Sequence, residues 1–258
     1  MPAPVLADRL RAGETLFTAW NAWPEPLLAE AEARAGFNCV TLDMQHGMHD
    51  AASVMRGVAA LARIGAAAIV RIPVGDNAFA NRALDMGAAA VIAPMINAVA
   101  DARAFAAATK FPPVGARSWG PFRAMALHGA DGNQAYLDTA NATTLALAMI
   151  ETNAALDALD DILAVDGIDG VFAGPSDMSV SLSDGARIDP RDRALDAPLK
   201  RMADRAAVAG KLAAGFAVDA ELARRLMDFG YRLIGVGNDD RYLTGGVQAL
   251  LAAVKRRG

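Results

Sequence analysis

Short apolar runs, several rich in β-branched residues, alternate along this chain with longer, alanine-rich stretches. The longer stretches, such as 51–63 and 194–209, carry apolar residues every three or four positions and predict helices. A glycine precedes most of the short runs, as expected where a helix ends and the chain returns to a sheet. The short runs predict strands at 14–20, 37–43, 66–71, 88–93, 144–150, 168–173, 211–217 and 232–237.

Eight strands that are each followed by a helix and are apolar on both faces predict a parallel sheet closed into a (β/α)8 TIM barrel. The 258 residues, 54% of them hydrophobic, suffice for such a barrel as a single domain over 1–258. An open doubly wound sheet would show the same alternation. We favour the barrel, because no glycine-rich dinucleotide fingerprint follows the first strand. Two connections, 111–125 and 174–191, are long enough to suggest functional loops.

Charge and cysteine content argue against several classes of function. The net charge is −4 and there is no basic run, so neither nucleic acid nor an anionic membrane is expected as a partner. The single cysteine, Cys39, lies in an apolar stretch, which leaves no disulfide framework and favours a cytoplasmic enzyme. No apolar run approaches the roughly 18 residues of a membrane span, and the N-terminus does not resemble a signal peptide.

Polar and pocket-forming residues follow the ends of the predicted strands. In a barrel of this kind the active site lies at the mouth formed by those carboxyl ends. The candidates at this mouth are Trp20, Asp43, His46, Arg71, Glu151 and the run Gly174, Pro175, Ser176 and Asp177. Asp85 falls instead near the end of the third predicted helix, away from the mouth.

Glu151 and Asp177 are the candidate metal ligands. Neighbouring strands lie about 4.8 Å apart, so carboxylates at the ends of the fifth and sixth strands can share a cation. A divalent ion relieves the repulsion between two such carboxylates, and oxygen ligands favour Mg²⁺ or Mn²⁺, with Co²⁺ and Zn²⁺ as further candidates. Alternatively, Glu151 is an acid at a helix N-terminus and Asp177 a loop cap. Their shared position favours the metal site.

Arg71 and His46 are candidate catalytic residues. A guanidinium at the end of a buried strand needs an anion; an internal aspartate could supply it, but a substrate carboxylate or enolate is the favoured interpretation. His46, with Asp43 to fix its tautomer, forms a candidate acid–base pair, the alternative being a core histidine bonded to a carbonyl. Trp20 is a candidate pocket wall, and His49 is interpreted as structural.

The lysines argue against a Schiff-base mechanism, which needs a lysine pointing inward from a strand. Lys211 opens the seventh strand, at the opposite end of the barrel from the mouth. The other lysines, which fall on helices or near loops, are Lys110, Lys200 and Lys255. Electrophilic assistance is therefore expected from a metal ion.

The chain resembles the HpcH/HpaI aldolase family over nearly its whole length. The matching stretches are LDMQHGMHD, VRIPVGDNAFANRALDMGAAAVIAPMINAVADA, GARSWGPFRA and AMIETNAALDALDDILAVDGIDGVFAGPSDMSVSLS. The last is the most specific, because it contains both candidate metal carboxylates. The resemblance implies a class II, metal-dependent pyruvate aldolase, similar to 4-hydroxy-2-oxoheptanedioate and 2-dehydro-3-deoxyglucarate aldolases.

The resemblance also implies a role for each site residue. Glu151 and Asp177 would bind the divalent metal. Arg71 would contact the keto oxygen of pyruvate and stabilise its enolate. His46, with Asp43, would transfer protons, although a metal-bound water is an alternative base.

Further implications concern assembly and substrate. Asp85 would act from a neighbouring subunit, and the backbone at Ser176 and Asp177 would hold the pyruvate carboxylate. The resemblance implies a homohexamer, a trimer of dimers, with the last helix exchanged between barrels. Gln45 and Met149 depart from the glutamate and glutamine of many sugar-acid members, which bears on the choice of donor and acceptor.

The expected reaction is the reversible aldol cleavage of 4-hydroxy-2-oxo acids to pyruvate or hydroxypyruvate and an aldehyde. One alternative is a citrate-lyase-like acyl-CoA lyase. It would need basic residues at the mouth for the CoA phosphates; Arg117 and Arg123 are the candidates, although their stretch GARSWGPFRA could equally be an interface loop. The other is a non-catalytic metabolite-binding barrel, against which the full set of acid–base and metal candidates argues.

Overall fold

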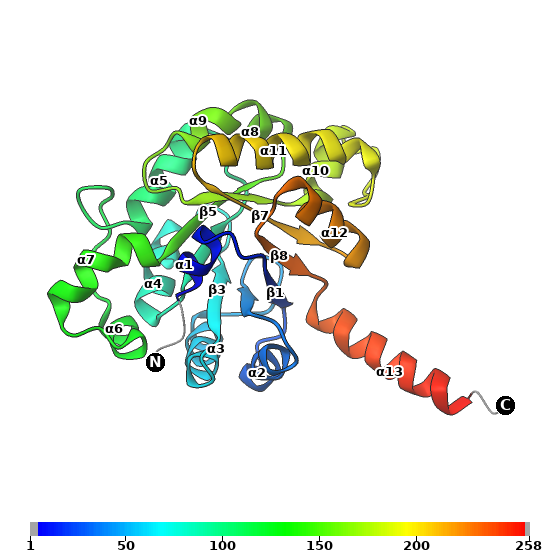
Figure 1. The fold of residues 1–258 in the computed structure, drawn as a ribbon, viewed down its shortest axis with the longest axis horizontal. Coiled ribbons are helices and arrows are strands. Elements are labelled where there is room, and N and C mark those ends of the chain that lie inside the picture. The colour runs from blue at the N-terminus through cyan, green and yellow to red at the C-terminus, as the bar shows by residue number, and fades with distance from the viewer. Residues whose placement is uncertain (1–4, 256–258) are drawn as a thin grey trace.

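Eight parallel strands close into a barrel in sequence order in a computed structural model that describes residues 5–255 (Figure 1). β1 pairs with both β2 and β8, so the predicted TIM barrel is confirmed and the open sheet is excluded. The strands are β1 (Leu16–Asn21), β2 (Cys39–Asp43), β3 (Ala67–Arg71), β4 (Ala90–Ala93), β5 (Leu145–Ile150), β6 (Gly170–Ala173), β7 (Leu212–Ala217) and β8 (Leu233–Val236).

The strands lie within the predicted runs, except that β1 continues one residue further, to Asn21. Side chains alternate between two cores, as the period of a strand requires. One core fills the barrel and includes Trp20, Met149 and Phe172. The other lies between strands and helices and includes Leu42. The single-domain prediction over 1–258 extends to residues 1–4 and 256–258, which lie outside the described residues.

Helices surround the barrel (Figure 1). They are α1 (Leu6–Arg11), α2 (Pro26–Arg34), α3 (Ala51–Arg63), α4 (Asn77–Met86), α5 (Val99–Thr109), α6 (Phe122–His128), α7 (Asn133–Thr143), α8 (Asn153–Asp157), α9 (Leu159–Leu163), α10 (Pro175–Leu182), α11 (Asp196–Val208), α12 (Ala220–Phe229) and α13 (Asp239–Lys255). None of the helices within residues 5–255 has the length and apolar character needed to cross a membrane.

The two long connections are not loops throughout. α6 begins at Phe122, inside the predicted connection 111–125, and α10 occupies the first part of 174–191. Pro175 occupies the first turn of α10, where its fixed φ favours a helix and its missing N–H has no intrahelical partner to lose. The Gly174–Asp177 run is therefore a helix N-terminus and not an irregular loop.

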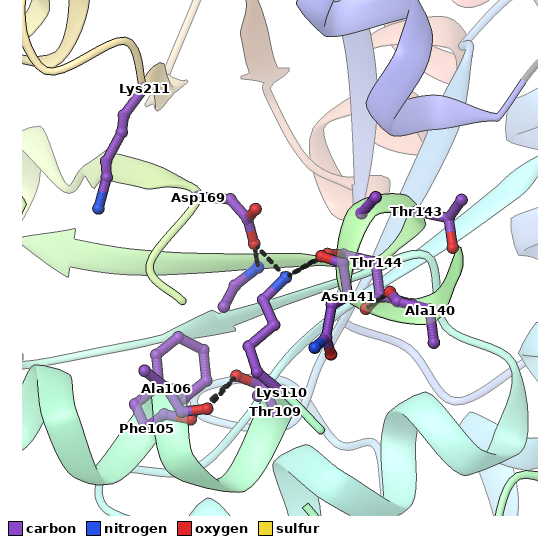
Figure 2. A network of polar contacts seen from close by, with 12 residues as sticks. Phe105, Ala106, Thr109, Lys110, Ala140, Asn141, Thr143, Thr144, Asp169 and Lys211 are labelled. Atoms are coloured by element: carbon purple, nitrogen blue, oxygen red, sulfur yellow. Dashed lines mark hydrogen bonds and ion pairs between the residues drawn. The ribbon is translucent and has the colours of Figure 1, made fainter. Parts of the chain in front are cut away.

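A buried lysine crosslinks the end of the barrel opposite the mouth (Figure 2). The Nζ of Lys110 lies 2.6 Å from Asp169 and donates to the carbonyls of Thr144 at 2.7 Å and Asn141 at 2.9 Å. Lys211 donates from the start of β7 to the carbonyl of Val165 at 2.7 Å, which confirms its predicted position. These two lysines hold the barrel together and do not reach its mouth.

The last helix, α13, extends away from the barrel (red in Figure 1). Only its first residue, Asp239, is buried. The large apolar side chains that it leaves exposed are Leu243, Val247, Leu250, Leu251 and Val254.

Candidate active site

Arg71 and Asp43 form a buried ion pair where β2 and β3 end. They are register partners on these adjacent strands. The Nε and Nη2 of Arg71 donate to the two carboxylate oxygens of Asp43, at 2.8 Å and 2.6 Å. Burial alone would raise the pKa of Asp43, but the hydrogen bonds and charge of Arg71 outweigh it and hold that pKa below its usual value. An internal aspartate therefore pairs with Arg71, through two of the five guanidinium N–H groups.

Trp20 contacts both residues of this pair from inside the barrel. Its indole Nε1–H donates to Asp43 at 3.3 Å, and the guanidinium of Arg71 lies 4.8 Å from the centre of its ring. The ring also packs against Phe172 and Phe216, with centroids 5.7 Å and 5.1 Å apart. Trp20 therefore fixes the orientation of the charged groups as well as lining the interior.

His46 lies on the loop after β2, with its side chain exposed. The carboxylate of Asp43 accepts hydrogen bonds from the backbone N–H groups of Gln45, at 3.0 Å, and His46, at 3.4 Å. Within residues 5–255, no hydrogen bond joins this carboxylate to the His46 ring. The structure therefore brings Asp43 to the backbone of His46 but does not show the direct carboxylate–imidazole pair that their proximity in sequence suggested.

His49 and Asp50 complete the same loop. The Asp50 carboxylate accepts from the backbone N–H of Ser53 at 2.7 Å and caps α3. The His49 ring is buried and lies 2.9 Å from the side-chain oxygen of Asn21, whose Nδ2 donates to Glu32 at 3.1 Å. This agrees with the structural interpretation of His49. Sequence reasoning missed Asn21 and Glu32, although Glu32 shares the buried face of α2 with Ala29, three positions before it.

Glu151 presents an unused carboxylate oxygen at the end of β5. Its Oε1 accepts from the backbone N–H of Met95 at 2.9 Å, whereas its buried Oε2 has no hydrogen-bond partner within the described chain. Burial is the main cause that raises the pKa of Glu151 to about 7; repulsion by nearby Asp177 also raises it, and the charge of Arg71 opposes the shift. The structure therefore groups Glu151 with Asp177 and Arg71.

Gly174 keeps the space beside this oxygen open. A Cβ at position 174 would lie 2.4 Å from Oε2 of Glu151 and 2.7 Å from Cε of Met149. The next residues, Pro175 to Asp177, form the first turn of α10. Backbone N–H groups in a first turn lack intrahelical partners and suit an anion.

The donors present fit a hard divalent cation. A buried carboxylate oxygen without a partner, close to a second carboxylate, is a favourable site for Mg²⁺ or Mn²⁺. No cluster of three or more His, Cys, Asp or Glu side chains suited to a metal occurs within residues 5–255. Two protein carboxylates are a usual number for Mg²⁺, which keeps water or substrate oxygens in its other positions.

Asp85 and Arg117 form a second ion pair on the outside of the barrel. Asp85, on α4, accepts from Nη2 of Arg117 at 2.6 Å. The guanidinium also donates to Asn81 at 3.2 Å and lies over the ring of Phe111 at 4.5 Å. Arg117 is only 4% exposed, so it is not available to bind CoA phosphates. That candidate of the acyl-CoA lyase alternative is wrong.

Residues 16–244 match the model of a family described as HpcH/HpaI aldolase/citrate lyase. The chain belongs to the HpcH/HpaI family. A hydroxypyruvate/pyruvate aldolase of Roseovarius nubinhibens is 35% identical, over 93% of each chain. A 2-keto-3-deoxy-L-rhamnonate aldolase of Salmonella gallinarum is 32% identical, over 96% of this chain and 92% of its own.

Comparison with a solved structure also supports membership of this family. A crystal structure of an HpcH/HpaI aldolase/citrate lyase family protein from Burkholderia cenocepacia is 31% identical, with a TM-score of 0.86 over 97% of this chain and 98% of that chain. The expected family membership is confirmed. As an HpcH/HpaI family protein with aldolase relatives, the chain is a carbon–carbon lyase of a class that generally depends on a divalent metal.

Proposed function

We propose that this enzyme catalyses reversible aldol cleavage of 4-hydroxy-2-oxo acids, giving pyruvate or hydroxypyruvate and an aldehyde. The observation that carries the proposal is the buried Oε2 of Glu151, which has no hydrogen-bond partner within residues 5–255 and lies near Asp177 and Arg71. The relatives named hydroxypyruvate/pyruvate aldolase and 2-keto-3-deoxy-L-rhamnonate aldolase support this class of substrate.

Glu151 and Asp177 would hold the divalent cation, with Mg²⁺ or Mn²⁺ preferred over Co²⁺ or Zn²⁺. When bound, such an ion supplies Lewis-acid stabilisation of negative charge on a substrate oxygen. Gly174 preserves the necessary room, because any larger residue would collide with Glu151.

Arg71 stabilises the enolate. Asp43 occupies two of its five N–H groups and Trp20 packs beneath it, so the guanidinium is oriented before substrate arrives. Its remaining N–H groups donate to the keto oxygen, on which negative charge develops. The backbone N–H groups of Ser176 and Asp177, at the start of α10, bind the carboxylate of the oxo acid.

His46 is the residue that transfers protons in the proposed reaction. In the cleavage direction a base removes the proton of the C4 hydroxyl, the C3–C4 bond breaks, and its electron pair forms the enolate as the aldehyde leaves. A proton delivered to C3 then gives pyruvate. The exposed His46 ring at the mouth is our candidate base, with water as the alternative. Asp85 would assist from a neighbouring subunit.

The same proposal includes assembly as a homohexamer, a trimer of dimers, in the cytoplasm. It is supported by the apolar side chains that α13 leaves exposed as it extends away from its own barrel. Exchange of this helix between barrels would bury them. Light scattering after size-exclusion chromatography measures the assembly, and a monomer at micromolar concentration would contradict this part.

The experiment that tests the function removes the metal. EDTA treatment should abolish both aldol cleavage and the exchange of pyruvate C3 protons for deuterium, and Mg²⁺ or Mn²⁺ should restore both. A panel of aldehydes with pyruvate or hydroxypyruvate then identifies the substrates. Full activity in metal-free protein contradicts the proposal, and calorimetric pyruvate binding without turnover indicates a metabolite-binding barrel instead.

A further inference from the structure

The loop that carries His46 is attached to the end of β1. The backbone N–H of Met48 donates to the carbonyl of Ala22 at 2.7 Å. Gly47 packs so closely that an added Cβ would lie 3.0 Å from Ala22 and 2.3 Å from the carbonyl oxygen of Asp43. The position of His46, just before Gly47, therefore depends on what holds residues 21–23 and the loop together.

A chain of buried side chains makes this attachment. Glu32 on α2 accepts from Nδ2 of Asn21 at 3.1 Å, which directs the Asn21 oxygen away from Glu32. That oxygen lies 2.9 Å from Nε2 of His49, so in this amide orientation Nε2 is the donor. Glu32, Asn21 and His49 are 6%, 0% and 8% exposed, and their contacts link α2, β1 and the loop after β2.

The other ring nitrogen of His49 reaches the start of α3. Its Nδ1 lies 3.2 Å from Oγ of Ser53, and this Oγ accepts a hydrogen bond from the backbone N–H of Asp50 at 2.8 Å. The ring is thus held at both ends, and it cannot turn without breaking a buried hydrogen bond at each. Leaving a buried polar group unpaired is costly, which keeps the ring, and the loop before it, in one position.

We propose that His49 is a positioning residue, which, held by Asn21 and Glu32, fixes the loop 44–49 and with it the place of the His46 ring relative to Arg71. His49 contacts neither the substrate sites proposed above nor the carboxylate of Glu151. It acts through the backbone of two intervening residues, Gly47 and Met48. The inference rests on the proposed function only where His46 transfers protons; the attachment itself is a feature of the fold.

The first test needs no substitution. The chain has three histidines, so histidine labelled with ¹⁵N gives a simple ring spectrum of the complete protein. His49 should show a proton on Nε2 that exchanges slowly with water. A His49 ring that exchanges as fast as an exposed histidine would overturn the proposal.

The second test compares variants. His49→Leu removes both ring hydrogen bonds, whereas His49→Gln keeps an amide N–H for Asn21; His128→Gln is the control, exposed on α6. We expect His49→Leu to shift or broaden the His46 ring signals and to lower kcat for cleavage about tenfold, a part of the roughly 100- to 10,000-fold that acid–base catalysis contributes. KM should change less than twofold, and His49→Gln should recover most of kcat.

The outcomes separate the two proposals. A folded His49→Leu protein with unchanged His46 signals and unchanged kcat overturns the positioning role and leaves the proposed function intact. Full activity in His46→Asn removes His46 from proton transfer, while the ring spectra still report whether His49 holds the loop. If His49→Leu does not fold, Asn21→Ala removes the same attachment and must displace the His46 signals.

Discussion

Arg71 donates two hydrogen bonds to Asp43, at 2.8 Å and 2.6 Å, from one strand to its neighbour in the barrel. Both residues are buried, and neither depends on a substrate to hold the other in place. A buried pair of this kind adds little net stability, but losing one partner leaves an uncompensated charge. Asp43 is therefore best understood as the residue that orients the guanidinium.

Asp43→Asn tests this relationship. The amide offers one acceptor in place of two and leaves the guanidinium without a counter-charge, so we expect a loss of about 3 kcal/mol in the free energy of unfolding. A displaced Arg71 should lower kcat roughly 100-fold. The double variant Asp43→Leu/Arg71→Met should regain stability without activity. Urea denaturation and cleavage rates measure both effects, and wild-type values for Asp43→Asn would contradict the assignment.

Gly174→Ala tests the space beside Glu151. The added Cβ would lie 2.4 Å from Oε2, so the carboxylate must move. We expect Mn²⁺ affinity, measured by calorimetry or by the paramagnetic signal of free Mn²⁺, to fall at least tenfold, and cleavage to fall with it. Gly245→Ala, on α13 with nothing within 4 Å of the added carbon, is the control. Unchanged affinity in Gly174→Ala would place the metal elsewhere.

Lys110→Met separates stability from catalysis. Lys110 lies at the end of the barrel opposite the mouth, and its loss leaves the buried carbonyl of Thr144 and the partly buried carbonyl of Asn141 without their donor (Figure 2). Asp169 keeps its hydrogen bond from the backbone of Ala146. We expect a loss of about 3 kcal/mol in stability and an unchanged kcat at temperatures where the variant is folded. A proportionate fall in kcat would disprove this separation.

Lys211→Met is the matched control for that variant. Lys211 is at the same end of the barrel, and within the part of the chain that the structure describes it donates to a single carbonyl, that of Val165. Its loss should therefore lower the free energy of unfolding by about 1 kcal/mol.

Glu32→Gln tests the buried carboxyl beside Asn21. Burial, together with repulsion by Asp239, raises the pKa of Glu32 from 4.5 to about 7, while the hydrogen bond from Asn21 opposes the shift. The folded state then binds this proton more tightly than the unfolded state does. The resulting stabilisation is complete below pH 4.5 and is lost as the pH rises through 7, an effect of up to about 3 kcal/mol.

Urea denaturation between pH 4 and pH 8 measures this effect. The stability of the native protein relative to Glu32→Gln should fall as the pH rises across that interval. Glu30→Gln, at a partly exposed neighbour on α2 that pairs with Arg34, is the matched control. Parallel curves for the native protein and Glu32→Gln would show that the carboxyl does not titrate in this range.

The sequence was sufficient to predict the barrel, because the hydrophobic period of each segment and the number of strands can be read from local stretches of the chain. It also located Glu151, Asp177 and Arg71 at one mouth, since parallel strands end together. The sequence was less informative about which side chains pair with one another. Asp43 is three residues from His46 in the chain, yet its carboxylate pairs with Arg71, which the strand register places beside it.

Two further features depended on packing between distant segments. Arg117 looked available for an anion in sequence, but Asp85 and the ring of Phe111 enclose it. Asn21, Glu32 and His49 come from three separate segments, and no motif connects them. Only Glu32 could have been noticed from the sequence, because helical periodicity places it on the buried face of α2. Periodicity does not identify the side chain with which Glu32 pairs.

The position of Trp20 has an optical consequence. The chain has three tryptophans, and the other two, Trp23 and Trp119, are more exposed. Replacing those two by phenylalanine would leave one fluorophore, in contact with the guanidinium on one side and with two phenylalanine rings on the others. Its emission would follow any movement of Arg71, so that the occupation of the barrel mouth can be recorded in real time without an added dye.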